Sequence, residues 1–124
     1  MKKKLLIILL LIISFQGPAQ RFQKINTLES LLNSETDLKK LVTVFYELSM
    51  LYESSNPEKA MENALRSLTI SKSLQDNVGI VNAYNQIGLL ELNFAHYQAA
   101  LDAHYSALKN NEQTKDLKGI SLSN

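Results

Sequence analysis

The feature that most constrains this chain is an internal repeat with a period of about forty residues. Segment 73–80, SLQDNVGI, recurs as QTKDLKGI at 113–120. Segment 59–68, KAMENALRSL, recurs as AALDAHYSAL at 99–108. A chain that repeats at such a period predicts a solenoid, in which each unit covers the apolar face of its neighbour.

Every segment with a clear period is typical of a helix. In FQKINTLESLLN, at 22–33, the apolar residues recur three or four positions apart, which places them on one helical face. The sequence has no sustained alternation of apolar and polar residues and no Asn-Gly or Asp-Gly turn that would indicate strands. Because the breaks between helices are short, neighbouring helices are expected to be antiparallel. We therefore predict an all-α fold of antiparallel helical hairpins stacked as an α-solenoid.

The N-terminus predicts an export signal at residues 1–19. Lys2–Lys4 precede the apolar run Leu5–Ile13, and Gly17 and Ala19 are small residues that fit a cut after Ala19. An uncleaved membrane anchor is the alternative, although the run is shorter than the roughly 20 apolar residues that span a bilayer. The prediction is therefore a periplasmic or secreted protein, with membrane attachment as part of a longer protein as the alternative.

The remainder divides into a leading helix and helical units. We expect the leading helix at 20–35, since Gly17-Pro18 should break the helix before it. A first repeat is predicted at 36–75, a second at 76–113, and the first helix of an incomplete third repeat at 114–124. Ser34 or Thr36 is expected to cap the first helix of repeat one. Asn56 or Ser55 should cap its second helix, with Pro57 at the first helical position.

Composition excludes several classes of function. Loss of the three N-terminal lysines changes the formal net charge from +1 to −2, which leaves no cationic surface for nucleic acid. The chain has no cysteine, so thiolate zinc sites are excluded. The two histidines, His96 and His104, lie eight positions apart and do not form a metal pair on a helix. No phosphate loop or nucleophile elbow is present. We predict no metal, no cofactor and no enzyme activity, with an exported enzyme with an unusual site as the weakest reading.

The repeat units share an order of aromatic and small residues. In the second unit this order is carried by Tyr84, Ile87, Gly88, Tyr97, Ala100, Ala107 and Leu108; in the first by Phe45, Leu48, Ser49, Tyr52, Ala60 and Leu68. The pattern resembles the tetratricopeptide repeat, in a variant longer than the usual repeat of about 34 residues. Glu91, His104 and Ser67 depart from it. Gly88 and Ser49 are expected at close helix contacts, surrounded by Tyr84, Ile87, Leu90, Leu101 and Leu108.

The resemblance implies a groove that is lined by the first helices of the units and that binds a protein or peptide. Carried over to this sequence, the groove residues are Thr43, Tyr46, Met50, Glu53, Asn82, Asn85, Leu89, Leu92 and Asn93. Asn amides can bond both donors and acceptors of an extended peptide. The alternative is that these side chains face only solvent or a neighbouring unit. Segment 76–94 contains no Lys or Arg, so a clamp on a terminal carboxylate is not expected.

Two functions follow from this resemblance. The favoured one is an exported scaffold that binds protein or peptide. The alternative is the N-terminal sensor segment of a membrane signalling protein, such as a histidine kinase, whose output lies outside this chain. In either case the apolar residues of 114–124, with no second helix to pair with, predict self-association through this last segment.

Overall fold

The computed structural model describes the backbone of residues 2–123 and the side chains of residues 3–4 and 17–114. That part of the chain contains helices only. They are α1 (Lys2–Ser34), α2 (Leu38–Tyr52), α3 (Pro57–Leu74), α4 (Asn77–Asn93) and α5 (Tyr97–Ser123). The predicted all-α fold is thereby confirmed.

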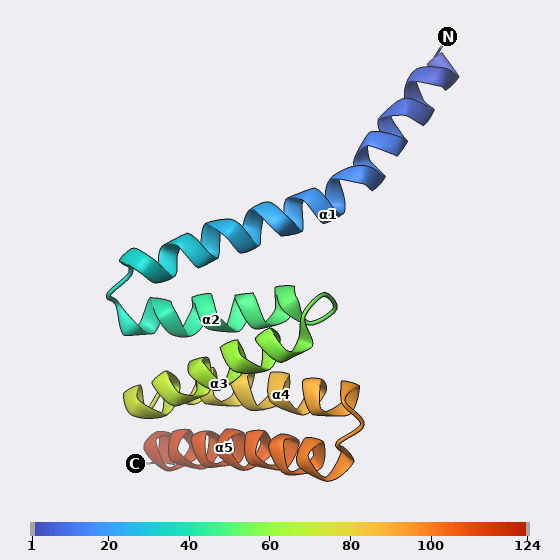
Figure 1. Ribbon diagram of the computed structural model, residues 1–124. Coiled ribbons are helices and arrows are strands. Elements are labelled where there is room, and N and C mark those ends of the chain that lie inside the picture. Colours follow the sequence, from blue (N-terminus) through green and yellow to red (C-terminus); the bar gives the residue numbers. More distant parts are fainter. Residues whose placement is uncertain (1, 124) are drawn as a thin grey trace.

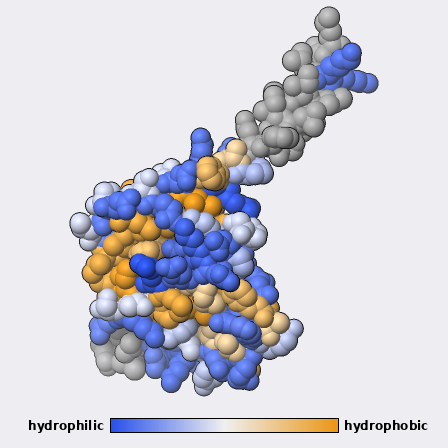
Figure 2. All heavy atoms as spheres, viewed as in Figure 1, coloured by the Kyte–Doolittle hydropathy of each residue, from blue (hydrophilic) through white to orange (hydrophobic). Residues whose placement is uncertain are grey.

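Successive helices run back and forth and form two stacked hairpins (Figure 1). Helices α2 and α3 form the first hairpin and α4 and α5 the second, while α3 packs on α4 and α1 lies against α2. Helix α2 also contacts α4, so the first helices of the two hairpins lie side by side. In the view of Figure 2, hydrophobic residues form a patch on the left of this stack and appear again across its middle toward the lower right.

Short polar side chains define the helix starts. Asp37 caps α2 by accepting the N–H of Lys39 at 3.0 Å, so neither Ser34 nor Thr36 has the predicted role. Asn56 caps α3 through Lys59 N–H at 3.2 Å, with Pro57 next to it, as predicted. An aspartate or asparagine in this place binds the free N–H groups of the first turn.

The first hairpin is joined by small residues and two buried hydroxyls. Ser49 on α2 donates to the carbonyl of Ala60 on α3 at 2.7 Å. Ser67 on α3 donates to the carbonyl of Val42 on α2 at 2.9 Å. Both hydroxyls are fully buried, and Ser49 thus lies at a close helix contact, as the sequence predicted.

The described residues of the second hairpin include no such hydroxyls, and the two helices are joined by a close contact. A Cβ on Gly88 of α4 would lie 2.7 Å from the ring of His104 on α5, so a larger residue there would require the ring to move. Ala100, Ala103 and Ala107 are buried on the same helix as His104. The main core combines α3, α4 and α5 through Ala60, Ala64, Leu68, Ile80, Ala83, Ile87, Leu90 and Ala103.

Two residues expected around the close helix contacts are exposed. Leu101 and Leu108 on α5 are 64% and 53% exposed, and Tyr97 of the repeat signature is 71% exposed. The counterparts of the two leucines, Met61 and Leu68 on α3, pack in the main core, where α4 covers them. The expectation was wrong because no helix covers the corresponding face of α5 among the described residues. Phe45, Leu48, Ala60, Ile87, Ala100 and Ala107 are buried as predicted, and Tyr52 and Tyr84 are half-buried.

Two predicted helix boundaries are absent. Helix α1 continues through Pro18, where a break was expected, because a proline removes one backbone hydrogen bond and can kink a helix without ending it. Helix α5 continues to Ser123, past the expected boundary at 113–114. There Asn110 and Thr114 bond back to carbonyls of their own helix, at 2.8 and 3.0 Å, instead of capping a new one. The division into repeats stays a prediction.

Two predictions concern residues outside the described side chains. These are the apolar core of the export signal at residues 5–16 and the apolar residues of segment 115–124.

Candidate functional site

A hollow of about 290 Å³ lies between the first helices of the two hairpins. Its walls come from α2 and from the start of α4, with Ser67 of α3 also in the lining. Four of the nine predicted groove residues line it: Thr43, Tyr46, Met50 and Asn82. The structure therefore brings together at one place residues that are up to 39 positions apart in the sequence.

Helical spacing places these side chains on the hollow. Thr43, Tyr46 and Met50 follow one another at intervals of three and four residues, so they share one face of α2. Val78 and Asn82 are four apart and share a face of α4 in the same way. Gly79 has no side chain and lies close to Ser71, since an added Cβ would lie 2.5 Å from the Ser71 hydroxyl oxygen. The absence of that side chain lets the start of α4 approach α3 beside the hollow.

The charged residues of the hollow are all acidic. Glu47 and Asp76 are lining residues, and no Lys or Arg is. Asp76 caps α4 by accepting the N–H of Gly79 through Oδ1 at 3.1 Å. Glu47 is half-buried and forms no ion pair or hydrogen bond with another described side chain. The hollow thus combines a largely apolar wall with negative charge.

The other predicted groove residues lie elsewhere. Glu53 and Asn93 lie together at the C-terminal ends of α2 and α4, with Asn93 Nδ2 3.5 Å from Glu53 Oε1. They line a second hollow that Met50 also reaches. Asn85 does not line the first hollow, and its Oδ1 lies 3.4 Å from Nδ1 of His104. Leu89 and Leu92 are 43% and 47% exposed.

Sequence reasoning missed the acidic lining residues and Val78. The helical period could have found Glu47, since it lies four positions after Thr43. The first helices of the two hairpins align at an offset of 39 residues, which pairs Phe45 with Tyr84 and Ser49 with Gly88. At this offset Gln86 takes the place of Glu47. It is buried, and its Nε2 has no hydrogen-bond partner among the described residues. The position of Asp76 beside the hollow follows from its place at the start of α4, which packs beside α2.

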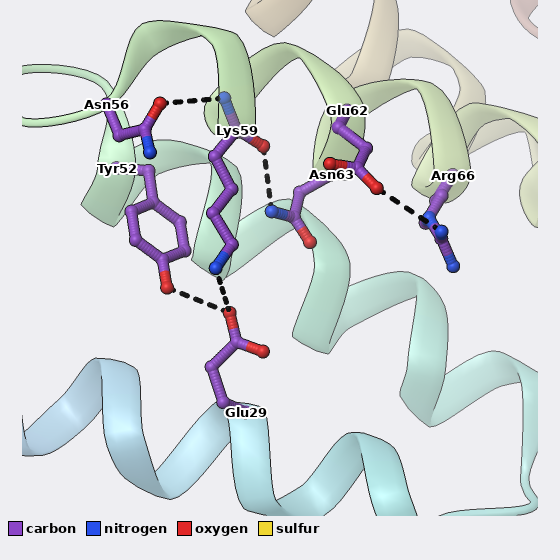
Figure 3. A network of polar contacts seen from close by, with 7 residues as sticks. All are labelled: Glu29, Tyr52, Asn56, Lys59, Glu62, Asn63 and Arg66. Atoms are coloured by element: carbon purple, nitrogen blue, oxygen red, sulfur yellow. Dashed lines mark hydrogen bonds and ion pairs between the residues drawn. The ribbon is translucent and has the colours of Figure 1, made fainter.

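A polar network connects α1 to the first hairpin (Figure 3). Tyr52 OH donates to Glu29 Oε1 at 2.8 Å, and Lys59 Nζ lies 3.8 Å from the same oxygen. Burial and the neighbouring Glu29 raise the pKa of the Tyr52 hydroxyl. The hydrogen bond to Tyr52 and the charge of Glu29 raise the pKa of Lys59. The network stabilises the packing of α1 and lies apart from the 290 Å³ hollow, whose lining includes none of these residues.

All three basic residues of α3 lie over aromatic rings of the first helices. Lys59 lies 5.0 Å from the Tyr52 ring centroid and Arg66 5.8 Å from that of Phe45. Lys72 lies 5.2 Å from the centroid of Tyr84. Cations in this position are attracted by the face of the ring. The cations of α3 are thus held at these rings, and none of them lines the hollow.

The histidines and acidic residues form no metal site in the described part of the chain. His96 Nδ1 lies 2.8 Å from Glu91 Oε2 at the α4–α5 turn, which gives the unexpected glutamate a partner. Across the described residues, no three His, Asp or Glu side chains converge as metal ligands. Within the same residues, no helix is both long enough and apolar enough to cross a membrane.

No family profile, curated protein or solved structure matches this chain.

Proposed function

We propose that this chain is an exported helical-repeat scaffold that binds a protein or peptide segment between α2 and α4. The single observation that supports this function is the convergence of Thr43, Tyr46, Met50 and Asn82 on one hollow. These residues belong to two different hairpins. The tetratricopeptide-repeat resemblance had named all four of them as groove residues. Apolar walls with a few polar groups are typical of a binding site.

The chemistry of the lining favours an extended peptide as the bound segment. The hydroxyl of Thr43 and the amide of Asn82 can each bond a peptide backbone group. Tyr46 and Met50 supply an aromatic ring and a flexible thioether for an apolar side chain. The predicted export signal at residues 1–19 supports the proposal that this binding occurs outside the cytoplasm.

A tryptophan reporter tests the function directly. The chain has no tryptophan, so Tyr46→Trp introduces a single fluorophore in the hollow. Peptides selected from a random linear library on the full chain should shift the emission of this tryptophan on titration. Asn82→Tyr, which fills the hollow, should abolish binding, whereas Thr69→Tyr, on an exposed position of α3, should not. If the selected peptides bind all variants with equal affinity, the proposal that the hollow is the binding site is refuted.

A further inference from the structure

We propose that the hollow selects a segment with a lysine or arginine, whose cationic group is held by Glu47 and Asp76. This inference rests on the proposed function and names the chemistry of its partner. It starts from the charge of the lining, in which the two carboxylates face no lining cation.

The lining of the hollow suits such a side chain. Long basic side chains bury an aliphatic stem against apolar surface and keep the charged end near polar groups. Tyr46, Met50 and Val78 provide the apolar surface for the stem, and Glu47 and Asp76 line the same hollow. The tyrosine ring can additionally attract a guanidinium or ammonium group through its face.

Among the described residues, no Lys or Arg forms an ion pair with either carboxylate. The three basic residues of α3 lie over aromatic rings, as described above. Lys39 and Lys40 line a neighbouring hollow between α1 and α2, whose lining also includes Thr43 and Glu47. Neither lysine lies within 4.0 Å of the Glu47 carboxylate, since no such ion pair is found among the described residues. Glu47 therefore remains available to a partner, and Asp76 retains Oδ2 while Oδ1 caps α4.

Charge-neutralising variants that keep the shape of the hollow test this inference. Glu47→Gln preserves size, and Asp76→Asn preserves an oxygen for the helix cap. The matched control is Glu62→Gln, because Glu62 is exposed on α3 and pairs with Arg66 at 3.3 Å, outside the lining. Circular dichroism verifies that each variant keeps the helical content of the unmodified chain.

The probes are random linear peptides selected on the full chain, followed by synthetic versions in which each Arg becomes citrulline and each Lys norleucine. We expect selected peptides rich in Lys or Arg, and an affinity that falls about five- to tenfold with Glu47→Gln. The neutral peptide should lose affinity to the same extent on the unmodified chain and little more on Glu47→Gln. Added salt should weaken the binding of the cationic peptide only.

The outcomes separate the two proposals. Peptides that shift Tyr46→Trp and are blocked by Asn82→Tyr, yet show no cationic preference and no effect of Glu47→Gln or Asp76→Asn, overturn the inference and leave the proposed function intact. The inference is also overturned if Glu47→Gln and Glu62→Gln change the affinity for cationic peptides to the same extent. Peptides that ignore both the filled hollow and the charge variants refute the proposed function and the inference together.

Discussion

The imidazole of His104 lies against Gly88, so closely that a Cβ on Gly88 would be 2.7 Å from ring atoms Cε1 and Nε2. Gly88 is buried in α4, and His104 is half-buried on α5. The sequence predicted a tight helix contact at Gly88, and the structure places His104 against it.

Substitution of Gly88 should therefore reduce stability in a way that depends on His104. Overpacking commonly costs about 1–3 kcal/mol, and alanine returns up to about 1 kcal/mol of helix propensity. We expect Gly88→Ala to lower the free energy of unfolding by about 1–2 kcal/mol in urea titrations. In a His104→Ala background the same change should be neutral or stabilising. An equal loss in both backgrounds would show that the ring does not limit this position.

The Tyr52–Glu29–Lys59 network should make stability fall at alkaline pH. The pKa values of Tyr52 and Lys59 are raised in the folded chain, so both groups bind their protons more tightly there than when unfolded. Their contribution is complete below the unfolded pKa and is lost as the pH rises above about 10. Tyr52→Phe should flatten the decline of the unfolding free energy in this range. Tyr97→Phe, at an exposed tyrosine, should leave it unchanged, and equal slopes for all three proteins would contradict the assignment.

The exposed face of α5 should cause the chain to self-associate at micromolar concentration. Leu101 and Leu108 are 64% and 53% exposed on the face that, in α3, is covered by α4, and Tyr105 on the same helix is 66% exposed. A second copy can cover it in the same way, because exposed apolar patches promote association. Sedimentation should show a dimer or larger species that Leu101→Glu converts to monomer. The control is Leu65→Glu, at the exposed position of α3 that corresponds to Tyr105, and this change should leave the self-association unchanged.

Export should remove the first nineteen residues. Expression with a C-terminal tag should give a product that starts at Gln20 in the exported fraction, because Gly17 and Ala19 fit the preference for small residues before the cut. Mass spectrometry of the intact protein determines the start. Ala19→Phe should delay or abolish the cut, and an intact Met1 in the membrane fraction of the unmodified protein would favour the anchored alternative.

The sequence alone predicted the helices that begin with a recognisable cap and an apolar stripe. Helix α3 begins at Pro57 after its predicted cap Asn56, and α4 begins at Asn77, next to the predicted start of the second repeat at 76. The continuation of α1 through Pro18 and of α5 past 113–114 was not predictable. Proline kinks or ends a helix depending on its surroundings, and an asparagine can cap a helix or bond back within it.

The candidate site was predicted in part for a similar reason. The resemblance to tetratricopeptide repeats named Thr43, Tyr46 and Met50 as groove residues, and their helical spacing places all three on one face of α2, which lines the hollow. How far α4 is displaced along α2 depends on tertiary packing. That displacement brings Asn82 to the hollow and leaves Asn85 beside His104. Likewise, the exposure of Leu101 depends on whether another helix covers its face of α5, which the local sequence around Leu101 does not determine.

The two buried serines also determine how α2 and α3 are aligned along their length. Ser49 follows Val42 by seven residues, and Ser67 follows Ala60 by seven, so both hydrogen bonds require the same antiparallel register. A slip of one helical turn would break both bonds at once, whereas apolar contacts between small residues would tolerate it. In the second hairpin Gly88 and Ala107 take the places of Ser49 and Ser67 and provide no hydroxyl. Sliding is therefore resisted by two buried directional bonds in the first hairpin. Among the described residues of the second, it is resisted mainly by shape, with the exposed 3.4 Å contact between Asn85 and His104 beside it. We expect α4 to be the wall of the hollow that can shift.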